Sequence, residues 1–125
     1  MGYRIGKSFS FDAAHFLSTL PSGHKCSRLH GHTYTVTVEL VSLALAPPGF
    51  VTDFGDLAPF AAYLDEQMDH RLLNDALDAE PTSELLARHM GEWFIAHVEP
   101  GLGASLSAVT VAESPTSWAR WEVER

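Results

Sequence analysis

Cysteine and basic residues are scarce in this sequence, and each scarcity excludes a class of protein. The 125 residues include one cysteine, so no internal disulfide can form and a disulfide-stapled secreted fold is excluded. Only 8 lysines and arginines stand against 16 aspartates and glutamates, which gives a formal net charge of -8. A general nucleic-acid surface is therefore not expected, because it needs cations that replace the counterions of the phosphates.

Long apolar runs are missing as well. No stretch approaches the roughly 20 apolar residues of a membrane span, and the first residues contain no apolar core of a signal peptide. We therefore expect a cytoplasmic protein with no membrane partner. The apolar content of 46% suffices for one modest core, so we expect a single domain over residues 1–125, which oligomerisation can complete.

The few cations are unevenly distributed. Residues 1–38 contain four of them against a single anion, Asp12, whereas the rest of the chain is strongly acidic. Two interpretations stay open: this histidine-rich third faces a small anion, or its cations belong to an ordinary solvated surface.

Two segments near the N-terminus alternate with the period of two that is typical of β-strands. In the first, one parity is apolar except at Lys7, and it continues to His15. In the second, His30 and His32 precede an apolar series of the same parity, which consists of Tyr34, Val36, Val38 and Leu40. The sequence "APPG" at residues 46–49 then ends the strand, because consecutive prolines cannot continue a hydrogen-bonded ladder.

Two amphipathic helices and two further strands follow. The spacing predicts one helix over residues 56–68 with Asp56 as its N-cap, and a second helix that begins after Thr82 and ends at Pro100–Gly101. The inner stripe of the second helix is predicted to contain Leu86, Met90, Trp93, Phe94 and His97. Residues 105–113 and 117–124 are predicted strands.

The resulting order, ββααββ, predicts an α+β fold with a four-stranded antiparallel sheet and two helices on one face. Such a sheet leaves two edges open, so pairing of edges between subunits is a natural route to a ring or barrel.

Histidines on these strands indicate a zinc site. His30 and His32 are two residues apart, so on a strand both side chains point to the same side. If the two strands pair as a hairpin, His15 at the end of the first lies beside them, and three neutral imidazoles are a common ligand set for catalytic Zn2+. The alternative is that the two histidines are simply polar residues at the start of a strand.

The single cysteine, Cys26, has two interpretations. It can complete a closed structural site with the three histidines, although its spacing does not match that of zinc fingers. It can also act as a thiolate base or nucleophile, which then needs a partner.

Asp69 and His70 are candidates for that partner, because an aspartate can orient an imidazole and fix its protonation. The alternative for His70 is a helix-end histidine that interacts with the helix dipole.

Glu113 also has two interpretations. It shares the parity of an apolar strand face, where its carboxylate needs a partner such as the guanidine-like edge of a pterin. The alternative is an exposed glutamate at a turn.

The combination of motifs resembles the 6-pyruvoyl-tetrahydropterin synthase family, and most of all its queuosine-pathway branch, the 6-carboxy-5,6,7,8-tetrahydropterin synthases. The motifs span residues 11–119 and are, in order, "FDAAH", "GHKCSRLHGHTY", "VTDFGDL", "MDHRLLND", "PTSE" and "ESPTSWA". The three residues between Cys26 and the HGH sequence are typical of the queuosine branch. A branch with glutamate in place of the cysteine is disfavoured. Ser114 stands where the family often has threonine and keeps the hydroxyl.

The resemblance implies the tunnelling fold (T-fold), in which subunits form trimeric barrels that usually stack as hexamers. It implies zinc bound by His15, His30 and His32. It also implies the following roles for the remaining site residues: Cys26 as the proton-abstracting base, Asp69 and His70 as an acid–base pair, Glu113 as the anchor of the pterin ring, and Thr82 and Ser83 as hydroxyls beside it.

The implied reaction converts 7,8-dihydroneopterin triphosphate into 6-carboxy-5,6,7,8-tetrahydropterin and releases acetaldehyde and triphosphate. Two alternatives stay open. One is 6-pyruvoyl-tetrahydropterin synthase activity on the same substrate, and the other is a non-catalytic, zinc-stabilised module that binds pterins.

Overall fold

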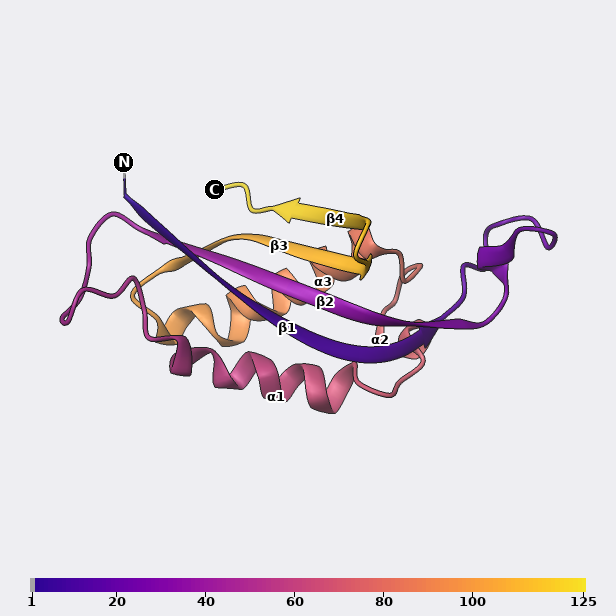
Figure 1. Cartoon of the computed structure of the whole chain (residues 1–125), viewed down its shortest axis with the longest axis horizontal. Helices are drawn as coiled ribbons and strands as arrows, with labels where there is room; N and C mark the ends of the chain where they lie inside the picture. The colour runs from indigo at the N-terminus through magenta and orange to yellow at the C-terminus, as the bar shows by residue number, and fades with distance from the viewer. Residues whose placement is uncertain (1) are drawn as a thin grey trace.

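Two long antiparallel strands, β1 (Tyr3–His15) and β2 (His30–Ser42), dominate the fold (Figure 1). The structure is a computed structural model that describes residues 2–125. β3 (Ser105–Ser114) and β4 (Ser117–Glu122) complete a sheet of order β1-β2-β3-β4, in which every neighbouring pair is antiparallel. The predicted α+β architecture is confirmed.

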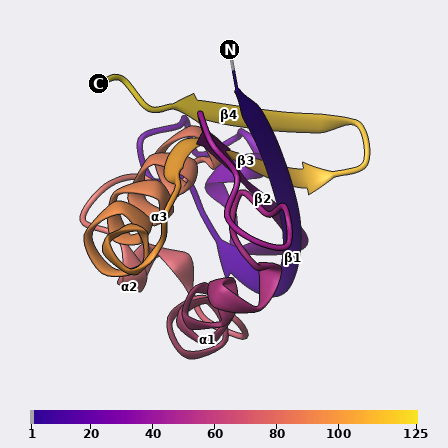
Figure 2. The ribbon, with the colours of Figure 1, turned by 90° about the vertical axis from the view of Figure 1, so that its left-hand side faces the viewer.

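Helices cover one face of this sheet. The helical segments are α1 (Ala58–Gln67), the short α2 (Leu73–Ala76), α3 (Ser83–His97) and the 3-10 turns η1 (Lys25–Ser27), η2 (Phe54–Leu57) and η3 (Glu99–Gly101). Figure 2 looks along the molecule and shows α1 and α3 together on the same side of the strands. Among the described residues, no helix is long and apolar enough to cross a membrane.

The core lies between the sheet and α1 and α3. Period-two alternation places one face of β2 in it, so that Tyr34, Val36 and Val38 are fully buried. Phe60 of α1 and Phe94 of α3 meet there in an edge-to-face contact with ring centroids 5.4 Å apart. Along β1 and β2 the opposite face of the sheet is mainly polar, because most of the alternate residues are serines, threonines and charged side chains.

Three details differ from the sequence-based expectations. α1 begins at Ala58, and Asp56 is not its N-cap; instead Asp53 caps the preceding η2 by accepting a hydrogen bond of 2.8 Å from the backbone N–H of Gly55. The local Asp–Phe–Gly turn thus takes the capping role. α2 was not predicted, because four residues are too few to show a periodicity.

The third difference concerns α3. Thr82 is its N-cap as predicted, and it accepts a hydrogen bond from the backbone N–H of Leu85. His97 is exposed, so its predicted place in the inner stripe is wrong. Its ring stacks on that of Trp93 with centroids 4.7 Å apart, at the end of the helix.

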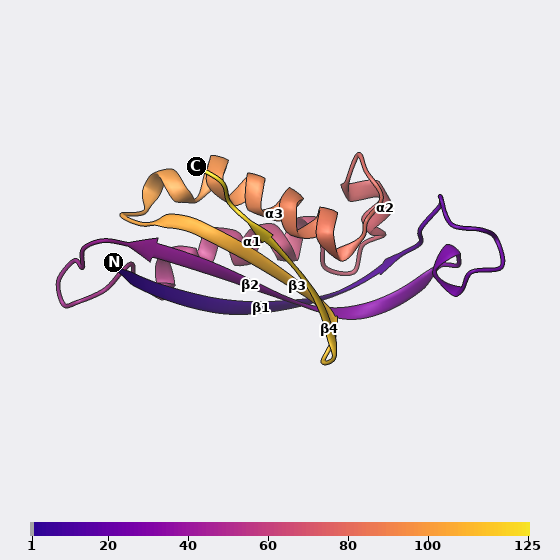
Figure 3. The same cartoon turned by 90° about the horizontal axis from the view of Figure 1, so that it is seen from above.

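The hairpin of β1 and β2 projects past the helices. Figure 3 shows this end of the sheet, together with its connecting loop, extending beyond α3. The segment around α2 lies beside the base of this projection, where Ala14 and Leu72 form an isolated parallel bridge. The predicted histidines are located here.

Candidate metal site and its surroundings

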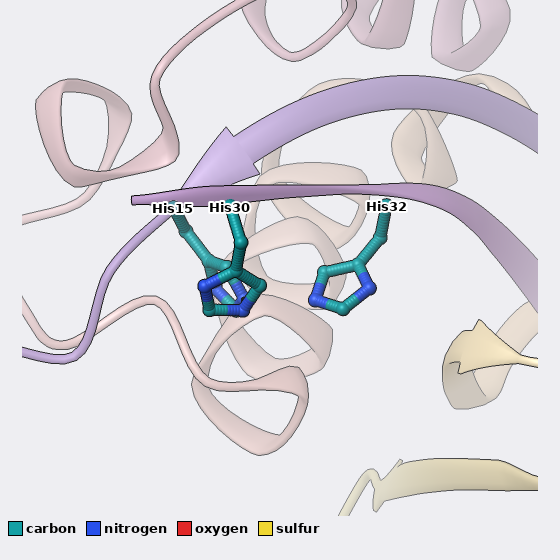
Figure 4. A group of neighbouring side chains, drawn as sticks. All are labelled: His15, His30 and His32. Carbon is teal, nitrogen blue, oxygen red and sulfur yellow. The ribbon is translucent and has the colours of Figure 1, made fainter. Parts of the chain in front are cut away.

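The pairing of β1 with β2 brings three histidines together. His15 is directly opposite His30 in the strand register, and His32 is opposite Ala13. All three side chains point to the same side of the sheet, as the parity predicts (Figure 4). Their ring centroids are 4.5 to 5.1 Å apart, and their potential ligand nitrogens all lie within 4.8 Å of one another.

Backbone carbonyls orient two of the three rings. His15 Nδ1 lies 2.7 Å from the carbonyl oxygen of Pro81, and His30 Nδ1 lies 2.7 Å from that of Arg28. Because a carbonyl only accepts hydrogen bonds, each Nδ1 must carry the proton. In the neutral rings both Nε2 atoms then present lone pairs, and these two atoms are only 3.0 Å apart. A cation between them removes this repulsion, so the residues fit a metal ion.

His32 supplies the third nitrogen. Its Nε2 is buried without a hydrogen-bond partner, 3.7 Å from Glu113 Oε2. Burial lowers the pKa of His32, and the charges of His15 and His30 lower it further, although Glu113 acts in the opposite direction. The ring is therefore neutral at neutral pH, which is the form that binds a metal.

Glu113 connects this cluster to α3. The hydroxyl of Ser83, the first residue of the helix, donates a hydrogen bond of 2.8 Å to Glu113 Oε1. The carboxylate keeps 30% of its side-chain surface exposed, so it is held in place and still accessible. Thr82 is adjacent, but its hydroxyl oxygen is occupied as the helix cap.

Tyr34 is a neighbour that the sequence analysis did not identify as part of the site. It is fully buried, its hydroxyl has no hydrogen-bond partner, and its ring centroid is 5.4 Å from that of His32. Burial and the charge of Glu113 raise its pKa far above the ordinary value, so it remains a neutral phenol. The available signal was its parity, which continues that of His30 and His32 along β2.

Asp69 and His70 are located at the outer edge of β1. Asp69 Oδ2 accepts a hydrogen bond of 2.9 Å from His70 Nδ1, and Asp69 Oδ1 accepts one from the backbone N–H of Asp12. His70 has a positive φ of 56° and a side chain that is 80% exposed. Within residues 2–125, no hydrogen bond or ion pair joins Asp69 or His70 to the three histidines.

The Asp69–His70 contact changes both pKa values. The backbone hydrogen bond from Asp12 and the bond from His70 lower the pKa of Asp69. The hydrogen bond to Asp69 and its negative charge raise the pKa of His70. His70 therefore stays protonated to a higher pH than an isolated histidine does.

Cys26 lies in the hairpin loop. It is half-buried within η1, its backbone N–H donates to His24 Nδ1 at 3.0 Å, and its carbonyl accepts from Leu17. The metal-ligand cluster of the described residues contains the three histidines and not Cys26. This placement gives no support to a closed four-ligand site.

Fold and site together define an α+β protein in which three imidazoles can hold a metal ion, next to an anchored carboxylate. Comparison with known proteins makes this more specific. Residues 4–124 match the family of 6-pyruvoyl tetrahydropterin synthase, and the chain belongs to this family.

Individual relatives agree with this assignment. The 6-carboxy-5,6,7,8-tetrahydropterin synthase of Synechocystis sp. is 39% identical over 123 residues, which cover 94% of this chain and 91% of that protein. Its namesake from Bacillus subtilis is 32% identical over 124 residues, which cover 93% and 82%. The solved structure of Caenorhabditis elegans 6-pyruvoyl tetrahydropterin synthase matches with a TM-score of 0.84 at 25% identity, over 99% of this chain and 97% of that one. The chain is thus an enzyme, a lyase of the pterin synthase type.

Proposed function

We propose that this enzyme converts 7,8-dihydroneopterin triphosphate into 6-carboxy-5,6,7,8-tetrahydropterin with release of acetaldehyde and triphosphate, as a step in queuosine and 7-deazapurine biosynthesis. The observation that carries the proposal is the three-histidine cluster beside the Glu113–Ser83 pair. The names of the Synechocystis and Bacillus relatives support the choice of product.

Zinc is the metal proposed for His15, His30 and His32, because three imidazoles and an open position are its common catalytic environment. When bound, zinc supplies Lewis acidity that makes the hydroxyl and adjacent carbon protons of the substrate side chain easier to remove.

Glu113 is proposed to bind the pterin ring. A carboxylate accepts two parallel hydrogen bonds from a guanidine-like edge, and the pterin presents such an edge in its ring N–H and amino group. Ser83 fixes one oxygen of Glu113, so the carboxylate is oriented before the substrate arrives. The hydroxyls of Ser83 and Thr82 line the same end of α3.

Cys26 is proposed as the base that abstracts a proton, and His70, oriented by Asp69, as the group that relays or returns one. His70 points to solvent at the edge of β1, so we propose that it reaches a substrate bound between subunits of a trimer or hexamer. Lys25 and Arg28, both exposed in the hairpin loop, belong to the four cations of residues 1–38 whose positive charge suits the anionic triphosphate.

The test is product analysis with 7,8-dihydroneopterin triphosphate and the zinc-loaded enzyme. We expect 6-carboxy-tetrahydropterin and acetaldehyde in equal amounts. His15→Ala should bind less zinc and lose activity, whereas His89→Ala, which changes a histidine of α3 outside the cluster, should do neither.

Pyruvoyl synthase activity is the second candidate, favoured by the likeness to the solved Caenorhabditis elegans structure. A pyruvoyl-pterin formed without acetaldehyde would establish it and reject the first proposal. The non-catalytic alternative is not supported, because the matched relatives are enzymes.

A further inference from the structure

A single segment between α1 and α3, residues 69–81, follows the outer edge of β1 at its site end. Alternate residues of the chain from 12 to 18 each hydrogen-bond to it. The contacts are Asp12 with Asp69 and His70, Ala14 N–H with the Arg71 carbonyl at 3.0 Å, Phe16 with Asn74, and Ser18 N–H with Glu80 at 3.1 Å. The segment thus occupies the position of a neighbouring strand, although much of it is not a strand.

Asn74 makes the most specific of these contacts. Its Oδ1 accepts from the backbone N–H of Phe16 at 3.0 Å, and its Nδ2 donates to the carbonyl of the same residue at 2.9 Å. A carboxamide bound to both groups of one residue imitates the paired hydrogen bonds of an antiparallel strand. Both partners are half-buried, so breaking the pair leaves backbone groups poorly solvated.

Phe16 lies between two parts of the proposed active site. It directly follows His15, and the next residue, Leu17, donates its backbone N–H to the carbonyl of Cys26 at 2.9 Å. The same segment that carries Asn74 also supplies the Pro81 carbonyl that orients the His15 ring. The backbone of His15 and the orientation of its ring are therefore both set from residues 69–81.

We infer that Asn74 is a positioning residue for the metal site: by clamping the backbone of Phe16 it holds His15 in register with His30 and keeps the loop of Cys26 against β1. This inference rests on the proposed zinc site. Within residues 2–125, the side-chain hydrogen bonds of Asn74 go to the backbone of Phe16 and not to the rings of the three histidines, so its effect is transmitted through backbone geometry.

Zinc affinity of Asn74→Ala, measured by competition with a chromophoric chelator, is the direct test. We expect the dissociation constant for zinc to rise by about tenfold, as is typical when a group that orients a metal ligand is removed. Asn74→Asp keeps the size and the acceptor but loses the donor, so its affinity should fall between those of Asn74→Ala and the wild type. The matched control is Asp75→Ala, an exposed neighbour in α2, which should bind zinc normally.

The outcomes distinguish a failure of this inference alone from a failure of the proposed zinc site. If Asn74→Ala lowers the thermal stability of the zinc-free protein but binds zinc within twofold of wild type, Asn74 is merely structural and the inference is overturned. If Asn74→Ala does not fold, Asn74→Asp decides by the same criterion. If wild type itself binds no zinc, or binds it equally after His15→Ala, the proposed site fails, and the inference fails with it.

Discussion

Backbone carbonyls determine the chemistry of single residues at this site. Pro81 and Arg28 bind the Nδ1 atoms of His15 and His30, so the Nε2 atoms are the ones that face each other. His32 has no such partner and is made neutral mainly by burial. Hydrogen bonds to carbonyls thus orient the rings of His15 and His30, and burial favours the neutral form of His32, so that all three can present a nitrogen to a metal ion.

Removal of the thiol should separate chemistry from metal binding. Cys26→Ala is expected to fold and bind zinc normally, because Cys26 is outside the histidine cluster, but to lose at least about 100-fold in turnover. Zinc content, circular dichroism and product formation measure the three properties. Thr19→Ala, an exposed position in the same loop, is the control. Loss of zinc in Cys26→Ala would show that the thiol is a ligand instead.

Asp69 should set the pH range over which His70 is protonated. Asp69→Asn keeps an oxygen for the Asp12 N–H but removes the negative charge that raises the pKa of His70. The pKa of His70 then falls, so the protonated form is lost at lower pH. If protonated His70 acts in turnover, the alkaline limb of the kcat profile moves to lower pH. An unmoved limb in Asp69→Asn, with Asp65→Asn as control, would contradict this role.

At the scale of elements, α3 links the core to the site. Its first residue, Ser83, hydrogen-bonds Glu113, while Gly91 in its middle lets the helix approach the sheet closely. A Cβ at Gly91 would lie 2.5 Å from Cε3 of Trp121 and 3.2 Å from Cγ2 of Val109. The absence of a side chain is therefore what allows β3 and β4 to pack under the helix.

A methyl group at this position should separate these elements. Gly91→Ala is expected to destabilise the protein by about 1–3 kcal/mol, the usual cost of overpacking, because an aromatic ring must move. Urea unfolding at fixed protein concentration measures the change in the free energy of unfolding. Gly101→Ala, where nothing lies within 4 Å of an added Cβ, should be neutral or slightly stabilising. Equal effects at both positions would refute the packing argument.

At the scale of the whole molecule, the sheet ends in two open edges, β1 and β4. Residues 69–81 cover β1 only near the site, so residues 3–11 retain a free outer edge within the described chain. We expect this edge to pair with β4 of another copy and to build trimers or hexamers.

A proline on the free edge tests this assembly. The N–H groups of Asp12 and Ala14 point outward, so by period two that of Ser10 does as well. Ser10→Pro removes an outward donor without breaking the ladder to β2, whereas Ser10→Ala keeps it. Light scattering should show a folded, smaller species for Ser10→Pro and unchanged mass for Ser10→Ala. A monomeric wild type would reject the expectation.

The buried and exposed faces of the strands follow from the amino-acid sequence alone. Alternation with period two is a local property, so it placed His15, His30 and His32 on the buried side of the first two strands before any contact was known. Local patterns also predicted α1 and α3 and the cap at Thr82, because capping depends on a few neighbouring residues.

Other contacts of the site depend on how distant elements pack against one another. Ser83 and Glu113 are 30 residues apart, and Asn74 and Phe16 are 58 apart, so no local period connects either pair. The Pro81 carbonyl that orients His15 has no side-chain signature at all. Such contacts depend on how sheet and helices pack, and packing is set by the whole core rather than by any segment of it.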